Sequence, residues 1–97
     1  MSTSVEVSGK IIDIRDTQEI GENGFKKRMM VVDTGGEYPQ KIPIEFVQAK
    51  TDLLDKFAVG DDVIVSVNLR GVEYEKNMEI NYFLSLQGWR IVKNGSS

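Results

Sequence analysis

The feature that most constrains the fold of this chain is an alternation of apolar and polar residues with a period of two. The alternation runs through residues 5–11 and returns in residues 63–69. It is typical of strands that have one face in a core and the other in solvent. In the first segment the pattern shifts by one residue at Ile12, shortly after Gly9, which predicts a bulge or a sharp bend. A strongly bent first strand is what a small closed barrel requires.

The whole chain predicts five strands and one helix. The strands are expected at residues 5–14, 25–33, 42–46, 63–69 and 80–92, and the helix at residues 47–57. Pro43 indicates an edge or irregular position in the third strand, and Gly88 a kink in the last one. Residues 70–79 are expected to form a polar loop or a ragged hairpin.

This order of elements predicts an all-β fold. It matches a five-stranded OB-fold Greek-key barrel with one short helix between strands 3 and 4. Another small barrel of the SH3-like kind is the alternative, and the position of the helix favours the OB-fold. A chain of 97 residues has room for one domain, which we expect over residues 1–93, followed by a frayed tail at residues 94–97.

The composition argues against most enzyme chemistry. The sequence contains no cysteine and no histidine, so it lacks thiol nucleophiles, His-based triads and the usual zinc ligands. Asp61 and Asp62 are neighbours after Gly60, and neighbouring side chains on an extended chain point apart, so a turn explains them. Residues 21–24 lack the lysine of a phosphate-binding loop. We therefore expect no enzyme activity, no cofactor and no metal.

Charge and hydropathy limit the partners. The net charge of −3 excludes a uniformly basic nucleic-acid binder but allows a locally basic face. No segment approaches the roughly 18 consecutive apolar residues of a membrane span. The sequence begins directly with a strand pattern, without the features of a signal peptide. We therefore expect a cytoplasmic protein with no membrane partner.

The second predicted strand carries the first candidate binding feature. Phe25 is followed by the densest run of positive charge in the chain, Lys26, Lys27 and Arg28. An aromatic ring beside cations suits single-stranded nucleic acid, because the ring stacks on a base and the cations meet phosphates. A solvated strand edge protected by lysines is the alternative. Since Arg28 shares the parity of Met30, which has the character of a core residue, we expect Phe25 and Lys27 to face outward.

The C-terminal part carries the second candidate feature. Arg70 and Tyr74 are expected to point outward near the loop between the last two strands, where OB-folds bind their ligands. Tyr82 is a further stacking candidate. For Trp89, packing at the bottom of the barrel and base stacking are equal alternatives. The predicted nucleic-acid contacts are Phe25, Lys27, Arg70, Tyr74, Tyr82 and Trp89, with further phosphate contacts at Lys26, Arg28 and Arg90.

A resemblance to a known family covers nearly the whole chain and is most specific in its last segment. It rests on residues 27–41, 53–55, 60–61, 68–71 and 82–91. They resemble a family of small bacterial and phage OB-fold proteins described as a domain of unknown function and similar to single-stranded DNA-binding proteins. The resemblance implies an OB-fold, and binding of single-stranded DNA during replication, recombination or repair. It places the protein in a bacterial cell or a phage-infected host.

The chain departs from the family pattern in three places. Tyr74 stands where family members often carry Trp, and Met30 where they tend to carry an aromatic residue. The sequence ends without the acidic tail of many bacterial single-strand binders, which makes a phage-encoded or accessory role more attractive. Because one weakly charged domain should bind weakly, we expect a homodimer or higher homo-oligomer, with replication or recombination proteins as further partners. The alternative is an OB-fold adaptor that binds proteins and no nucleic acid.

Overall fold

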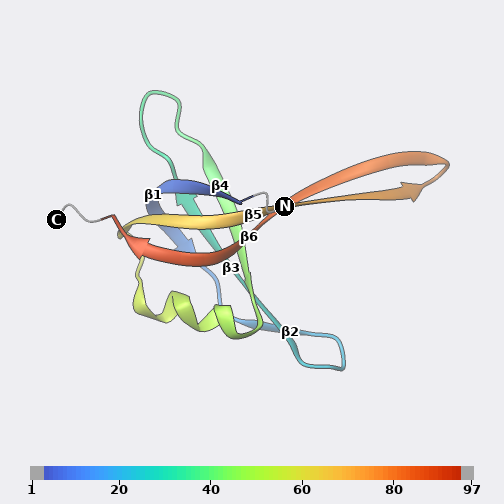
Figure 1. Cartoon of the computed structure of the whole chain (residues 1–97), viewed down its shortest axis with the longest axis horizontal. Helices are drawn as coiled ribbons and strands as arrows, with labels where there is room; N and C mark the ends of the chain where they lie inside the picture. The colour runs from blue at the N-terminus through green and yellow to red at the C-terminus, as the bar shows by residue number, and fades with distance from the viewer. Residues whose placement is uncertain (1–3, 95–97) are drawn as a thin grey trace.

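The computed structural model describes residues 4–94 (Figure 1). Its elements in chain order are β1 (Ser4–Ile14), β2 (Gln18–Ile20), β3 (Phe25–Asp33), β4 (Lys41–Val47), the 3₁₀ helix η1 (Gln48–Lys56), β5 (Asp62–Lys76) and β6 (Glu79–Lys93). Of the frayed tail expected at residues 94–97, residues 95–97 lie outside the described residues. Within the described part of the chain, no helix is long and apolar enough to cross a membrane.

The five long strands form a ring. They are hydrogen-bonded in the order β1–β5–β6–β4–β3, and a further pairing of β1 with β3 closes the ring. All pairings are antiparallel except that of β4 with β6, which is parallel and consists of Glu45 opposite Gln87. The all-β prediction of five strands, with a helix between the third and fourth, is confirmed. The short β2 is an addition that the sequence did not predict, and it extends β3 into a hairpin.

A bulge in β1 makes the closure of the ring possible. β1 pairs with β5 from Ser4 to Lys10 and with β3 from Lys10 to Ile14, and the register shifts between Ile11 and Asp13. The predicted bulge is therefore confirmed. Gly9 lies just before it, where the backbone passes close to β3, and a Cβ atom there would collide with the carbonyl oxygen of Asp33. Only glycine allows so close an approach of two backbones.

The core fills the inside of the ring. The buried apolar side chains come from every strand of the ring and from η1: Ile11, Met30, Val32, Ile44, Phe46, Leu54, Val63, Val65, Val67 and Ile91. Phe46 is the largest of them, and its ring lies against Gly88 of β6. Gly88 lies at an irregularity of the sheet, because the β5–β6 register shifts between Ser66 and Val67, directly opposite.

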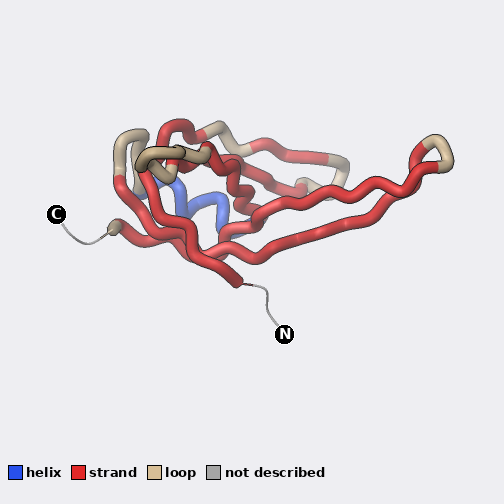
Figure 2. The backbone as a smooth tube through the Cα atoms, turned by 90° about the horizontal axis from the view of Figure 1, so that it is seen from above, coloured by secondary structure: helices blue, strands red, loops and turns tan. Residues whose placement is uncertain are grey.

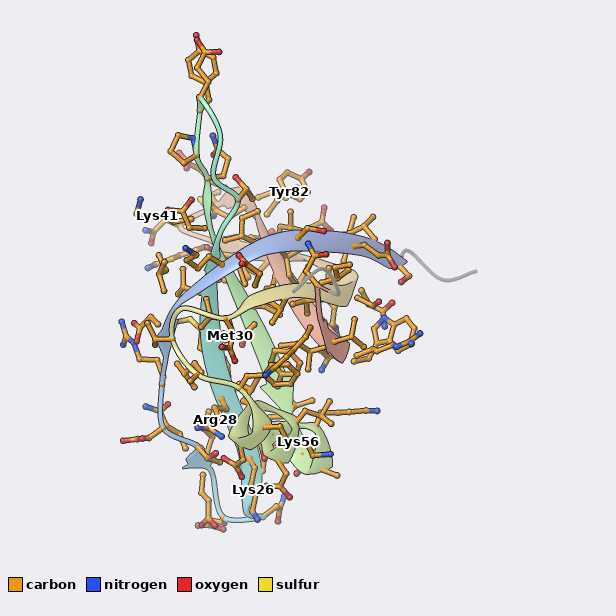
Figure 3. The ribbon with its side chains drawn as sticks, turned by 90° about the vertical axis from the view of Figure 1, so that its left-hand side faces the viewer. Lys26, Arg28, Met30, Lys41, Lys56 and Tyr82 are labelled. Atoms are coloured by element: carbon orange, nitrogen blue, oxygen red, sulfur yellow. The ribbon has the colours of Figure 1, made fainter. Side chains whose placement is uncertain are left out.

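Arg28 ties β3 to η1. Its Nη1 donates to Oδ1 of Asp55 at 2.8 Å and to the carbonyl oxygen of Thr51 at 3.3 Å, while its Nε donates to the carbonyl oxygen of Arg15 at 2.7 Å. In Figure 3, Arg28 lies beside the helix and Met30 lies within the ring. The guanidinium thus stabilises a short helix that has no side-chain cap at its N-terminus.

The β5–β6 hairpin extends far beyond the barrel (Figures 1 and 2). β5 and β6 pair continuously to Lys76 and Glu79, and the two turn residues Asn77 and Met78 have φ values of 54° and 64°. Positive φ at both central residues is typical of a type I′ turn, whose twist matches that of a hairpin. Of the two alternatives for residues 70–79, the hairpin is therefore the one that forms. Beyond Asn68, the hairpin projects as a two-stranded arm among the described residues.

Candidate nucleic-acid interface

The two faces of the projecting hairpin differ in chemistry. Residues opposite each other on paired strands share a face. One face, here called the groove face, carries Arg70, Val72 and Tyr74 of β5 and Phe83, Ser85 and Gln87 of β6. The other, here called the back face, carries Leu69 and Glu73 of β5 and Tyr82 and Leu84 of β6. A basic and aromatic surface is thus separated from an apolar and acidic one by the thickness of a single sheet.

The groove face meets the outer side of β3 and β4 across two adjoining hollows, here called the groove. The first hollow, of about 260 Å³, is lined by Phe25, Lys27, Glu45, Val47, Arg70, Val72, Phe83, Ser85 and Gln87. The second, of about 450 Å³, is lined by Lys27, Met29, Pro43, Glu45, Phe83, Leu84, Ser85 and Leu86. Because β6 borders the second hollow along its edge next to β4, residues of both hairpin faces reach it.

The groove combines exposed rings with a few polar groups. Phe25 and Phe83 are 38% and 58% exposed, so both rings are accessible to a ligand. Lys27 Nζ forms a salt bridge with the Glu45 carboxylate on the floor of the groove. Nη1 of Arg70 donates to Oε1 of Gln87 at 3.2 Å, which holds the guanidinium along the wall and leaves its other N–H groups available.

A third hollow continues the surface beyond Lys27 and Met29. It has a volume of about 410 Å³ and is also lined by Arg15, Asp16 and Gln18 at the β1–β2 connection. Arg15 Nε donates to Oδ2 of Asp13 at 2.7 Å. This hydrogen bond and the negative charge of Asp13 raise the pKa of Arg15 above its ordinary value. Arg15 is thus a cation at this end of the surface that is already paired with a carboxylate.

The structure brings together three of the predicted contacts in one hollow. Phe25 and Lys27 lie on the outer side of β3, as expected, and Arg70 faces them from β5. Tyr74 lies on the same groove face, farther out along the hairpin, and is 48% exposed. The four residues come from two segments about 45 positions apart in the sequence, and Tyr74 shares its hairpin face with Arg70.

Tyr82 and Trp89 lie elsewhere. Tyr82 is opposite Glu73 on the back face of the hairpin and is 75% exposed. Trp89 is unpaired at the register shift in β6 and is 40% exposed, so it lies neither in the core nor, within residues 4–94, in any of the hollows described above.

The three predicted phosphate contacts also lie away from the groove. Arg28 is engaged with η1, and its side chain is only 15% exposed. Lys26 lies at the outer end of β3, where its backbone N–H donates to Oε1 of Gln48 at 3.3 Å (Figure 3). Arg90 pairs with Ser66 near the base of the hairpin.

Sequence reasoning missed Phe83, Met29 and Arg15. The signal for Phe83 was available in the pairing of the hairpin. A two-residue turn at residues 77–78 sets Phe83 opposite Val72 and therefore on the same face as Arg70 and Tyr74. Met29 shares the parity of Phe25 and Lys27, so the alternation places it on the outer side of β3, but an apolar side chain gave no reason to expect a nucleic-acid contact there. Arg15 could not be found from the sequence, because its place depends on how the β2–β3 hairpin folds over the end of β1.

Among residues 4–94, no three or more acidic, cysteine or histidine side chains are placed to hold a metal ion. What the groove offers is flat apolar surface, two cations and one carboxylate, which are features of a binding site.

The sequence model of a family described as "Domain of unknown function (DUF3127)" matches residues 6–92. The chain belongs to this family. The family resemblance noted in the sequence is thereby confirmed. No protein of curated function matches the sequence.

Solved structures with a similar fold identify the architecture. The SSB domain of a protein from Synechococcus sp. superposes with a TM-score of 0.70 at 17% identity, covering 94% of this chain and 93% of that chain. Rim1, a mitochondrial single-stranded DNA-binding protein from S. cerevisiae, superposes with a TM-score of 0.73 at 13% identity, covering 97% and 96%. At these identities the likeness shows the fold alone. The predicted OB-fold is confirmed, and the chain has the architecture of an SSB domain.

Proposed function

We propose that this protein binds single-stranded DNA with little overall sequence preference, by base stacking and phosphate neutralisation, and performs no chemistry on it. The observation that carries the proposal is the groove itself. One continuous hollow is lined by two rings, Phe25 of β3 and Phe83 of β6. The same hollow is lined by two cations, Lys27 of β3 and Arg70 of β5. The SSB-like fold of the chain supports the proposal, because OB-folds bind oligonucleotides on this side of the barrel.

The exposed rings supply most of the affinity in this proposal. A base stacked on an aromatic side chain contributes about 1–3 kcal/mol, and any base can do so because every base has a flat face. Phe25, Phe83 and Tyr74 are each between a third and two thirds exposed without a strand or helix covering them. Exposed rings that gather along one groove are typical of a surface that a ligand covers.

The cations supply a smaller, salt-dependent part. Lys27, Arg70 and Arg15 lie along the three hollows, and the chain as a whole has a net charge of −3. Non-specific attraction of the whole molecule to a polyanion is therefore weak, and the local cations must act at short range. The rings and the cations together suit a single strand, whose bases are free to stack.

The wider setting is part of the same proposal. We place the protein in DNA replication, recombination or repair, in a phage-encoded or accessory role in the cytoplasm, with replication or recombination proteins as partners. We also propose that copies associate, because several weak grooves on one strand bind far more tightly than one.

A second candidate is a protein–protein adaptor. The observation that favours it is the back face, where Tyr82 and Leu84 are 75% and 63% exposed beside the acidic Glu73. An exposed apolar surface with acidic residues repels nucleic acid and suits a protein. The two functions use different faces of the hairpin apart from Leu84, which lies on the back face and also lines the second hollow.

Fluorescence anisotropy of a labelled oligo-dT tests the proposal. We expect saturable binding at low salt, and weaker binding to duplex DNA of the same length, because paired bases cannot stack in the groove. A labelled oligo-rU of the same length shows whether the sugar matters. Absence of binding to both single strands at low salt would contradict the proposed function and leave the adaptor as the better account.

A further inference from the structure

We propose that the groove prefers guanine at one position, where Lys27 and Glu45 recognise the Watson–Crick edge of a base stacked on Phe83. This inference rests on the proposed function and refines it. Most positions of the bound strand are accepted by stacking alone, while one position selects its base.

The position is defined by the residues that the two main hollows share. Lys27, Glu45, Phe83 and Ser85 line both. Apart from these, the larger hollow is lined by apolar residues, Met29, Pro43, Leu84 and Leu86. The volume of this hollow, about 450 Å³, lies in the size range of small-molecule sites. Its apolar walls and few convergent polar groups suit a flat ring with a polar edge.

The salt bridge on the floor leaves hydrogen-bonding capacity unused. A carboxylate has about four acceptor sites and an ammonium group three donors, so one contact between them uses only part of either. The Glu45 side chain is 24% exposed and the Lys27 side chain 40%. Partial burial among apolar neighbours strengthens any further hydrogen bond that these groups make and penalises a mismatched one.

Guanine complements this pair better than any other base. Its Watson–Crick edge presents two adjacent donors, N1–H and the N2 amino group, beside one acceptor, O6. The two oxygens of a carboxylate accept from the two donors, and the neighbouring ammonium donates to O6. Donor and acceptor on the protein thus have counterparts on one base.

The other three bases complement the Lys27–Glu45 pair less well. Thymine has a single N–H between two carbonyl oxygens, so a carboxylate that accepts from it lies close to an oxygen. Cytosine and adenine each offer one amino group next to a ring acceptor, which satisfies one carboxylate oxygen only. Because single-stranded bases expose these edges fully, the difference is available for recognition.

The ordinary interpretation of the pair is a cross-strand surface salt bridge. β3 and β4 pair antiparallel, with Met29 opposite Glu45, so Lys27 and Glu45 are diagonal neighbours on the same face. Such pairs contribute about 0–1 kcal/mol to stability. A salt bridge that only stabilises the sheet has no effect on which base binds. The dependence of affinity on the base therefore distinguishes the two roles.

The test uses the wild-type protein and short labelled oligo-dT strands with one central substitution. We expect a central dG to bind about tenfold more tightly than dT, dA or dC. Deoxyinosine, which lacks the N2 amino group, should lose most of this gain, whereas 7-deazaguanine, which is altered only on the opposite edge, should keep it. A central rG and free dGMP show whether the preference belongs to the base alone.

Two variants locate the preference. Glu45→Gln removes the charge that accepts two donors and should reduce the dG-to-dT ratio to near one, each affinity being measured on the variant itself so that any change in oligo-dT binding cancels from the ratio. Glu73→Gln makes the same change on the back face and should leave the ratio unchanged. Equal binding of dG and dT by the wild-type protein, with oligo-dT itself bound, overturns the inference alone. Absence of binding to every strand overturns the proposed function together with it. A dG preference retained in Glu45→Gln also overturns the assignment.

Discussion

At the scale of single residues, the two glycines of the long hairpin occupy opposite surroundings. A Cβ atom on Gly88 would lie 2.5 Å from the Cζ atom of Phe46, whereas a Cβ on Gly71 would meet no atom within 4 Å. Phe46 is fully buried and the largest side chain of the core, so it has little room to move. Gly88 is therefore a packing requirement of the barrel, and Gly71 is not.

Replacing each glycine by alanine tests this contrast. Gly88→Ala should lower the free energy of unfolding by about 1–3 kcal/mol, because the added methyl group forces Phe46 and its neighbours to shift. Gly71→Ala should change it by less than about 0.5 kcal/mol. Chemical denaturation of the two variants measures both values. Equal stability of the two variants would show that the Phe46 ring adapts, contrary to this account.

Two tyrosines near the hairpin tip distinguish its faces. Tyr74 lies on the groove face and Tyr82 on the back face, both exposed and one residue out of register. Tyr74→Ala should weaken oligo-dT binding by about 1–3 kcal/mol, because one stacking surface is lost. Tyr82→Ala, which removes a ring of equal size from the same arm, should have little effect. Anisotropy titrations measure both, and a larger loss for Tyr82→Ala would place the DNA on the other face.

At the scale of elements, η1 depends on Arg28 of β3 for its position. The guanidinium reaches Asp55 and the carbonyl oxygens of Arg15 and Thr51 from inside the structure. Loss of a largely buried charged donor leaves its acceptors without a partner, which is costly. The helix thus closes the end of the barrel through polar contacts as well as through Leu54 in the core.

Arg28→Ala should therefore destabilise the protein by about 1–3 kcal/mol. Lys26→Ala, two positions earlier on the same strand, removes an exposed cation and should cost less than about 0.5 kcal/mol. Thermal unfolding followed by circular dichroism measures both. If Arg28→Ala keeps full stability but loses DNA binding, then Arg28 contacts phosphate and its structural role is minor.

The same elements show how far the sequence could be interpreted. The alternation of Val63, Val65 and Val67 and the shift at Ile12 predicted the strands and the bulge, because both depend on local patterning. The long arm was left open, since residues 70–79 lack the strict alternation of a half-buried strand. Both faces of that arm are exposed, so no core imposes a period of two on it.

The site was only partly predictable for a related reason. Phe25 and Lys27 could be assigned outward because Met30 fixed the parity of β3. Tyr82 could not be assigned to a face without the turn at residues 77–78, since a shift of one residue reverses every side chain that follows. Arg28 was predicted to contact phosphate because of its charge. Its salt bridge with Asp55 could not be predicted, because that contact depends on where η1 packs.

At the scale of the whole molecule, a net charge of −3 and a groove with few cations predict a moderate dependence on salt. Arg70 has a neutral partner in Gln87 and neutralises one phosphate, whereas Lys27 and Arg15 already pair with Glu45 and Asp13 and each contribute at most one more. The slope of log Kobs against log salt concentration should lie between about −0.7 and −2.1, at roughly −0.7 per phosphate on a single strand. Titrations with oligo-dT over a range of NaCl concentrations measure it. A slope much steeper than this would indicate a basic surface outside the groove or an assembly of several copies on each strand.

The central claim is that one strand of DNA lies between the outer side of β3–β4 and the groove face of the hairpin. Mapping of backbone amide NMR shifts during titration with oligo-dT tests it most directly. The account predicts that the largest changes occur at Phe25, Lys27, Arg70 and Phe83, with small changes at Tyr82 and Trp89. Changes concentrated at Tyr82 and Trp89, with Phe25 and Phe83 unaffected, would contradict it.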